Sequence, residues 1–231
     1  MVSSAHTINT EGVSVSDLRE LLRGIEVFSG ELPVFDLTDL PADPHDLFTE
    51  WLLAALRDGV PVPHAMTLST AGADGDPTAR VLILKNVSRE GWQFASGSGS
   101  RKGRDLAARP AAALTFFWPQ SARQVRVTGD VTPATAEDSA ADFLARSPAA
   151  RAEALLGRQS GPLADLAERD TAVAAAAERI AGEPGLVAPQ WTLYTLRARS
   201  VEFWQGDRER RHTRVNYVRT EDGWDRGLLW P

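Results

Sequence analysis

The glycine-rich segment 97–103 is the clearest candidate for anion binding in the chain. It reads Gly-Ser-Gly-Ser-Arg-Lys-Gly, follows a predicted strand and opens a predicted short helix that ends near Pro110. Free backbone N–H groups at the start of a helix attract phosphate. The glycine and lysine spacings match neither a Walker A loop nor a dinucleotide-binding fingerprint. Two interpretations stay open: an anion site, or a flexible turn with two solvated cations, Arg101 and Lys102.

Two further cations, Arg80 and Lys85, bracket the apolar run Val81-Leu82-Ile83-Leu84. Apolar side chains at every position predict a strand that is covered on both faces. Long cationic side chains at the ends of such a run reach either water or an anionic ligand. Positions 80 and 85 fall on opposite faces of a regular strand, so they would contact different parts of a ligand, or only one of them would contact it.

A third cluster of charged side chains lies near the C-terminal end of the chain. If residues 210–214 are extended, Arg210, His212 and Arg214 project from one face. His212 then stands at the centre of a cationic wall, and histidine is the side chain that titrates nearest to neutral pH. A solvated charged surface is the alternative, because Asp207 and Glu209 lie nearby.

Composition excludes several classes of function. With 25 basic and 31 acidic residues, the 231-residue chain carries a formal net charge of −6, which opposes binding to nucleic acid or to an anionic membrane. The chain has no cysteine and its histidines lack metal-ligand spacing, so we expect no metal site, and redox chemistry would need an organic cofactor. No apolar run approaches the roughly 18 residues of a membrane span, and the start lacks a leader pattern, so we expect a cytoplasmic protein.

The elements that must position these residues are mostly strands. Residues 1–42 are predicted to form an N-terminal arm with one short helix, and residues 43–231 a single domain. Asp43-Pro44 is a helix start, and the amphipathic helix that follows ends at Gly59. Further helices are expected at 135–146 and 162–181. Strands are expected at 65–70, 79–85, 92–96, 112–118, 123–131, 193–205, 214–219 and 228–230, the first five as a meander that closes toward a barrel.

Together these segments resemble the FMN-dependent pyridoxamine 5′-phosphate oxidase family over roughly residues 40–231. Six ordered motifs carry the resemblance, and such a set rarely matches by chance. The motifs are Arg80-Val81-Leu82-Ile83-Leu84-Lys85, Ser100-Arg101-Lys102, Arg123-Gln124-Val125, Arg158-Gln159-Ser160, Val201-Glu202-Phe203-Trp204-Gln205-Gly206 and Arg210-Arg211-His212-Thr213-Arg214, with a weaker match at the final Trp230-Pro231.

The resemblance implies a mainly β fold with peripheral α-helices, an FMN-binding split β-barrel that forms a homodimer with FMN at the interface. Arg210 and His212 match the pair that faces the substrate. The substrate set that the resemblance implies is Lys85, Arg146, Asp142, Arg19, Arg210 and His212. The implied FMN contacts are Arg80, Val81, Leu82, Ile83, Leu84, Lys85, Ser96, Arg101, Lys102, Gln124, Gln159, Ser160, Trp204 and Arg214.

The implied reaction is a two-electron oxidation of a small molecule. A hydride leaves a carbon next to nitrogen for the flavin, and O₂ reoxidises the flavin to give peroxide. Arg210 would orient or electrostatically support the substrate, and His212 would hydrogen-bond it or handle a proton. A noncatalytic flavin- or heme-binding split barrel is an alternative from another class, because fold alone does not fix activity.

Departures from the family pattern bear on the substrate. The enzymes that form pyridoxal phosphate hold the substrate phosphate with lysine, tyrosine, arginine and serine; here Lys85 and Arg146 match, but Asp142 and Ala150 occupy the other two positions. An added carboxylate repels a phosphate. In the arm, Arg19 matches an arginine of the family, while Leu22 replaces its tyrosine.

Two segments point to different branches of the family. Residues 30–44 resemble the arm of the phenazine-biosynthetic branch, which oxidises reduced tricyclic dicarboxylic acids. The segments Lys85-Asn86-Val87 and Phe117-Trp118-Pro119 resemble the vitamin B6 branch. We favour oxidation of a reduced nitrogen heterocycle in secondary metabolism, with oxidation of pyridoxine or pyridoxamine 5′-phosphate as the alternative.

Overall fold

The computed structural model describes residues 17–28 and 30–231, so the first sixteen residues of the predicted arm and Ser29 lie outside the described residues. The helices are α1 (Leu18–Gly24), α2 (Pro44–Arg57), α3 (Arg101–Ala108), α4 (Ala136–Leu144), α5 (Pro148–Leu155) and α6 (Leu166–Gly182). The strands are β1 (Ala65–Ala71), β2 (Pro77–Ile83), β3 (Asn86–Ser88), β4 (Gly91–Gly97), β5 (Ala111–Trp118), β6 (Arg123–Pro133), β7 (Trp191–Gln205), β8 (Thr213–Arg219) and β9 (Trp224–Leu228). Within the described ranges, no helix is long and apolar enough to cross a membrane.

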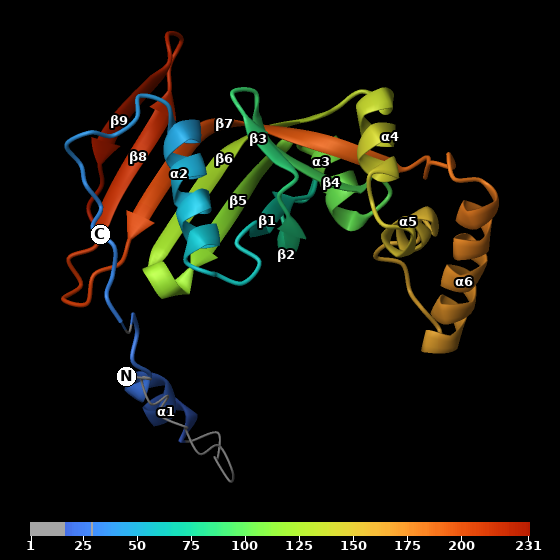
Figure 1. Cartoon of the computed structure of the whole chain (residues 1–231), viewed down its shortest axis with the longest axis horizontal. Helices are drawn as coiled ribbons and strands as arrows, with labels where there is room; N and C mark the ends of the chain where they lie inside the picture. Colours follow the sequence, from blue (N-terminus) through green and yellow to red (C-terminus); the bar gives the residue numbers. More distant parts are fainter. Residues whose placement is uncertain (1–16, 29) are drawn as a thin grey trace.

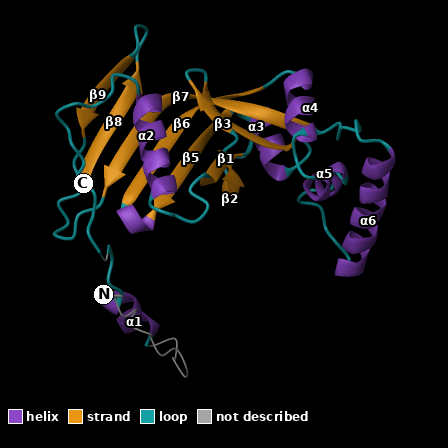
Figure 2. Ribbon diagram, in the orientation of Figure 1, coloured by secondary structure: helices purple, strands orange, loops and turns teal. Residues whose placement is uncertain are grey.

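The strands form one curled antiparallel sheet with helices at its periphery (Figures 1 and 2). Its order is β2-β1-β5-β6-β7-β4-β3, with β8 on β7 and β9 on β8. The mainly β class with peripheral helices is therefore confirmed. The predicted meander is wrong, because β4 pairs with the distant β7 rather than with its sequence neighbour β5.

Strand β7 is the central strand of this sheet and pairs with three others. It is 15 residues long and pairs with β6 along one edge. On the other edge its first part pairs with β4 and its last part with β8. Figure 1 shows the consequence: helices α4, α5 and α6 lie at one end of β7, and the β8–β9 hairpin lies at the other.

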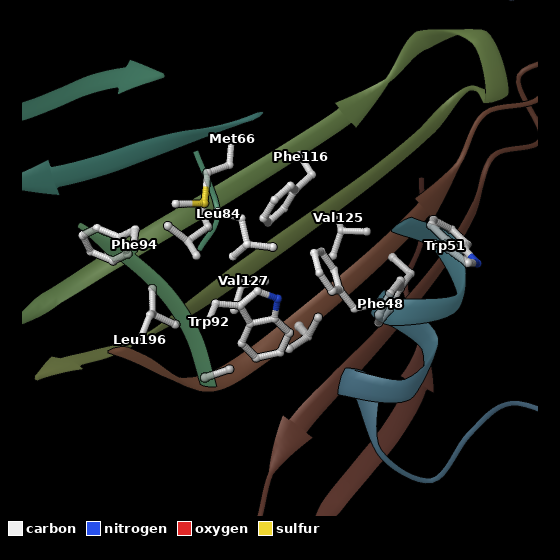
Figure 3. Close-up of a cluster of buried hydrophobic side chains, with 14 of the residues drawn as sticks. Phe48, Trp51, Met66, Leu84, Trp92, Phe94, Phe116, Val125, Val127 and Leu196 are labelled. Atoms are coloured by element: carbon white, nitrogen blue, oxygen red, sulfur yellow. The ribbon is translucent and has the colours of Figure 1, made fainter. Parts of the chain in front are cut away.

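Helix α2 packs over one face of the sheet, and its buried residues belong to the same core as those of the strands (Figure 1). The Asp43 side chain accepts a hydrogen bond from the His45 N–H, and Pro44 occupies the first turn, as the sequence predicts. The buried face of the helix places Phe48 against Trp92 and Phe116 (Figure 3), and the ring of Trp118 also lies against Phe48. Large aromatic side chains in edge-to-face contact therefore hold the helix on the sheet.

The strand that carries Arg80 lies at an edge of the sheet. Strand β2 pairs only with β1, and its side chains Val81 and Ile83 are 66% and 40% exposed. The expectation that residues 81–84 are covered on both faces is therefore wrong within one chain, although Leu84 is buried. An unbroken apolar run predicts that both faces of the strand are buried. It does not indicate whether the covering residues come from the same chain or from a second one.

Replacing Phe48 with alanine should destabilise the fold by about 3–5 kcal/mol, because a fully buried ring leaves a cavity among three aromatic side chains. Leu53→Ala on the same helix is the matched control, since Leu53 is 48% exposed and should cost less than about 1 kcal/mol. Urea denaturation at constant pH measures both. Equal losses for the two variants would contradict the placement of α2.

Candidate functional site

A cavity of about 620 Å³ lies between β2, β4 and the segments that surround α5 and α6. One part of its wall is apolar, with side chains of β2 and of the segment after α5. The other part is polar and charged. The polar lining comprises Lys85, Ser96, Ser100, Arg146, Glu153, Arg158, Gln159, Glu168, Arg169 and Gln190.

A buried lysine lies directly behind this wall. The Nζ of Lys102 donates to Ser96 Oγ at 3.0 Å, to Ser100 Oγ at 3.2 Å and to Gln159 Oε1 at 3.1 Å. Lys102 is 5% exposed, and no carboxylate of the described residues lies within ion-pair distance of it. Burial, together with the charge of Arg80, lowers the pKa of Lys102 to about 8. The site therefore holds a buried positive charge that lacks an anion.

The start of α3 fixes the position of this lysine. Ser100 caps the helix by accepting a hydrogen bond from the Gly103 N–H at 3.2 Å. A Cβ on Gly103 would stand 2.2 Å from the Ser98 carbonyl oxygen, so only glycine lets the helix start this close to the preceding loop. The tight turn also brings the Arg101 N–H to 3.5 Å from Ser160 Oγ. Of the two cations in segment 97–103, Lys102 is therefore buried rather than solvated, whereas Arg101 is exposed.

Arg80 is held beside Lys102 by a network that the sequence did not suggest. Its guanidinium donates to Thr70 Oγ1 at 2.8 Å and to Thr78 Oγ1 at 2.5 Å. Both hydroxyls donate in turn to Asp105 Oδ2, at 2.8 and 3.0 Å. Burial would raise the pKa of Asp105, but the two hydroxyl bonds and the charges of Arg101 and Arg80 outweigh it and lower that pKa. Thr70 and Thr78 thus connect Arg80 to Asp105 by hydrogen bonds, without direct contact between the two charged groups.

This relay depends on strand register. Thr70 and Thr78 face each other across β1 and β2, and Asp105 comes from α3, 35 residues beyond Thr70. The three residues are too far apart in the sequence for any local pattern to predict that they meet. Burial lowers the pKa of Arg80, and the charge of Asp105 partly offsets this.

The opposite end of the cavity pairs its lysine with a carboxylate. Lys85 Nζ lies 3.1 Å from Asp142 Oδ1, and Asp142 Oδ2 accepts a hydrogen bond from Trp191 Nε1 at 2.8 Å. The guanidinium of Arg146 lies 4.0 Å from the centre of the Trp191 ring. Burial lowers the pKa of Arg146, while the charges of Asp142 and Glu153 act in the opposite direction. Three of the predicted substrate residues therefore meet here.

The remaining predicted cofactor residues gather at the other end of β7. Trp204 stands between Gln124 on β6 and Arg214 on β8 in the strand register. Arg214 forms hydrogen bonds of 3.0 and 3.1 Å with the two carboxylate oxygens of Glu202, which raises the pKa of Arg214. Burial would raise the pKa of Glu202, but its bonds to Arg214 and Arg126 and their charges lower it.

The histidine of this second cluster has a defined tautomer. The Asp207 N–H donates to His212 Nδ1 at 3.0 Å, so the neutral ring carries its proton on Nε2. The ring lies 4.9 Å from that of Trp204, and Phe28 of the arm packs against both. Arg208 holds the arm here through the carbonyl oxygens of Phe28 and Gly30.

The condition under which Arg210, His212 and Arg214 would project from one face, an extended segment 210–214, is not met. Strand β8 begins at Thr213, and Arg210 lies in the preceding turn with φ = 62°. The Asp207 side chain closes this turn by accepting hydrogen bonds from the backbone of Glu209 and Arg211. A non-glycine residue with positive φ is uncommon outside functional or tightly built turns.

One chain does not bring the two clusters together. Ser96 pairs with Thr192 near the start of β7, and Arg214 pairs with Trp204 near its end. Twelve residues of extended strand separate these positions, which is about 40 Å. Arg19 lies apart from both, on α1, which stands away from the sheet (Figure 1). The predicted site residues therefore form two half-sites and one outlying residue.

Family models match most of the chain. Residues 52–182 match the model described as pyridoxamine 5′-phosphate oxidase. Residues 191–231 match the model described as the pyridoxine 5′-phosphate oxidase C-terminal dimerisation region.

Curated relatives carry the name pyridoxine/pyridoxamine 5′-phosphate oxidase. The one from Pseudomonas paraeruginosa is 40% identical over 193 residues, which cover 83% of this chain and 90% of the relative. The one from Thermosynechococcus vestitus is 41% identical over 194 residues, which cover 84% and 92%. That from Burkholderia lata is 40% identical over 187 residues, which cover 81% and 87%.

Among solved structures, PhzG from Burkholderia lata in complex with tetrahydrophenazine-1-carboxylic acid has a TM-score of 0.80 and 27% identity. The similarity covers 87% of this chain and all of PhzG. A pyridoxamine 5′-phosphate oxidase-related FMN-binding protein from Nostoc punctiforme has a TM-score of 0.64 and 19% identity over 84% of this chain and all of its own, which shows the fold alone.

The pKa of Lys102 predicts how anion affinity depends on pH. Below pH 8 the free protein carries the ammonium form, which attracts a phosphate group. Above pH 8 the lysine loses its proton, so binding must restore it. The Kd for FMN, the anion that the sequence resemblance implies, should then rise about tenfold per pH unit until the pKa of the bound state is reached. Quenching of flavin fluorescence by apoprotein between pH 7 and 9.5 measures this.

Lys102→Met is the control, and it should bind FMN more weakly at pH 7 and with little dependence on pH. A wild-type Kd that stays constant from pH 7 to 9.5 would show that Lys102 does not contact the anion.

Proposed function

The chain belongs to the pyridoxamine 5′-phosphate oxidase family, and we propose that it is an FMN-dependent oxidase that works as a homodimer. Its substrate is a reduced nitrogen heterocycle of the phenazine-precursor type, which loses a hydride from a carbon next to nitrogen. When bound, FMN supplies the hydride acceptor and passes the two electrons to O₂, which leaves as hydrogen peroxide.

The observation that carries this proposal is the buried ammonium of Lys102. A buried charge is stable only when it is paired or well hydrogen-bonded, and hydroxyl and amide oxygens alone leave its charge uncompensated. A phosphate dianion supplies the missing charge, and Arg80 with its planar guanidinium suits the same group. The Ser100 hydroxyl, which accepts from Lys102 and from the Gly103 N–H, can donate its own proton to the same group. The residues present therefore fit the phosphate of FMN.

The second half-site supports the dimer. Trp204, Gln124 and Arg214 cannot reach the cavity of their own chain, so they would complete the cavity of a second copy. The exposed apolar side chains Val81 and Ile83 are suited to burial against that copy. The match of residues 191–231 to a dimerisation region supports the same assembly.

Arg210 and His212 are the proposed catalytic residues. In the dimer they would face the substrate across the flavin from the second chain. Because Nδ1 of His212 already accepts from Asp207, its Nε2–H is the group free to donate a hydrogen bond to a substrate atom. Arg210, at the tip of the turn, would supply a positive charge that orients an anionic or electron-rich substrate.

Two observations compete over the substrate. PhzG, whose structure holds a reduced tricyclic acid, has the same fold at a TM-score of 0.80, and this favours a phenazine-type precursor. The 40% identity to relatives named pyridoxine/pyridoxamine 5′-phosphate oxidase favours the alternative, which is formation of pyridoxal 5′-phosphate. Both substrates fit the same class of reaction.

Turnover under air separates these functions. FMN-loaded protein should oxidise tetrahydrophenazine-1-carboxylic acid with a kcat/KM at least about tenfold above that for pyridoxine 5′-phosphate. O₂ consumption and peroxide release are the measurements. Rapid, saturable formation of pyridoxal 5′-phosphate would establish the alternative instead. No turnover of either compound, with slow reoxidation of photoreduced flavin, would indicate a noncatalytic flavin carrier.

Subunit mixing tests whether two chains share each site. Lys102→Met and Arg214→Leu should each abolish FMN-dependent activity in homodimers. When the two variants are co-expressed, about half of the dimers are mixed, and each mixed dimer has one intact site, so about a quarter of wild-type activity should return. Activity that stays absent in isolated mixed dimers would place each site within a single chain.

A further inference from the structure

Two lysines lie at the cavity, Lys85 in its lining and Lys102 behind it, and they differ in their hydrogen-bond and ion-pair partners. Lys102 has only hydroxyl and amide oxygens as hydrogen-bond partners among the described residues. Lys85 is paired with Asp142 at 3.1 Å. An anion that reaches Lys102 meets an uncompensated charge, whereas an anion that reaches Lys85 must first compete with a carboxylate. The two ends of the cavity therefore differ in their capacity for negative charge.

Asp142 is firmly placed, so it cannot easily release Lys85. Its second oxygen accepts from Trp191 Nε1 at 2.8 Å, and its side chain is 14% exposed. The carboxylate thus links a lysine from the end of β2 to a tryptophan at the start of β7. Rotating it away would leave a half-buried indole N–H without this acceptor, which is unfavourable.

Arg146 is the cation at this end that still lacks an acceptor. Its guanidinium lies over the Trp191 ring at 4.0 Å, and its Nη1 is buried with no hydrogen-bond partner in the described part of the chain. Glu153 lines the same cavity and, like Asp142, interacts electrostatically with Arg146. Lys85 and Arg146 together carry two positive charges, and Asp142 and Glu153 carry two negative charges. Arg158 and Arg169, which also line the cavity, form ion pairs with Glu168 and Asp170, so a dianion would find no excess positive charge here.

We infer that the cavity takes a single phosphate, that of FMN, and that Asp142 makes the substrate end select a carboxylate on a flat ring over a phosphate ester. A carboxylate brings one negative charge and matches the planar donors of Arg146. The apolar wall of Val81, Leu82 and Ile83 suits the ring. This inference rests on the proposed FMN oxidase and specifies its substrate, with Asp142 as the residue that determines specificity.

Equilibrium binding to the FMN-loaded protein tests this without turnover. The probes are phenazine-1-carboxylate, uncharged phenazine and 4-deoxypyridoxine 5′-phosphate, which has no oxidisable hydroxyl at its 4′ carbon. Changes in flavin absorbance report binding of each. The wild type should bind phenazine-1-carboxylate at least about tenfold more tightly than either other probe.

Asp142→Asn removes the charge and keeps an oxygen for Trp191. It should tighten binding of 4-deoxypyridoxine 5′-phosphate about tenfold or more, because Lys85 becomes available and one repulsion is lost. Glu137→Gln removes the same charge from an exposed position of α4 and should change neither affinity. Arg146→Met should reduce the preference for phenazine-1-carboxylate over phenazine to near unity.

Unchanged affinity of Asp142→Asn for the phosphate probe would overturn the inference, as would equal wild-type affinities for the phosphate and carboxylate probes. If Asp142→Asn does not fold, the wild-type comparison and Arg146→Met decide. Failure of the proposed oxidase function would instead appear as normal probe binding without oxidation of any reduced heterocycle, so the two failures are distinguishable.

Discussion

The positive charge of Lys102, buried with no carboxylate of residues 17–28 or 30–231 in ion-pair contact, is the constraint on which the site depends. An ammonium group in this position loses much of its hydration, and three neutral oxygens recover only part of the loss. Burial and the charge of Arg80 accordingly lower the pKa of the group to about 8. A protein that keeps such a group gains most when an anion binds, so ligand binding and local stability are coupled at the start of α3.

The surrounding elements maintain this charge in place. The cap of α3 by Ser100, the close approach of Gly103 to Ser98 and the bond from Lys102 to Gln159 tie three chain segments to one point. Arg80 is held by other contacts: it donates to hydroxyl groups on the paired strands β1 and β2, and these donate to a carboxylate on α3. The network gives the arginine a fixed direction and pairs it with hydroxyl groups rather than directly with the carboxylate of Asp105.

Strand β7 explains why the proposed enzyme needs two copies of the chain. Its length separates Trp204 and Arg214 from the cavity, while its register fixes each group firmly at its own end. A rigid strand cannot fold back to join them, so the halves can meet only across an interface. In the proposed dimer, cofactor binding and assembly would therefore stabilise each other. The same strand also carries Trp191, which ties the charge balance at the substrate end to the sheet.

The sequence by itself determined the parts of the protein that depend on local chemistry. The cap at Asp43 and Pro44, the amphipathic face of α2 and the capped start of α3 follow from residues a few positions apart. The ordered motifs also identified the family, because each motif keeps its side-chain types in a fixed local order. Local periodicity and local order need no knowledge of what lies across the sheet.

Only the tertiary structure decided which distant groups meet. Thr70 faces Thr78 through strand register, and Asp142 reaches Trp191 across 49 residues of sequence. Arg210 lies in a turn before β8 because the Asp207 side chain accepts hydrogen bonds from the backbone there, so it does not share an extended face with His212 and Arg214. Strand β4 likewise pairs with β7 and not with β5, the next strand in the sequence, as a meander would require. These contacts are set by packing and pairing over the whole chain, and a side chain's type does not specify the partner that folding will bring to it.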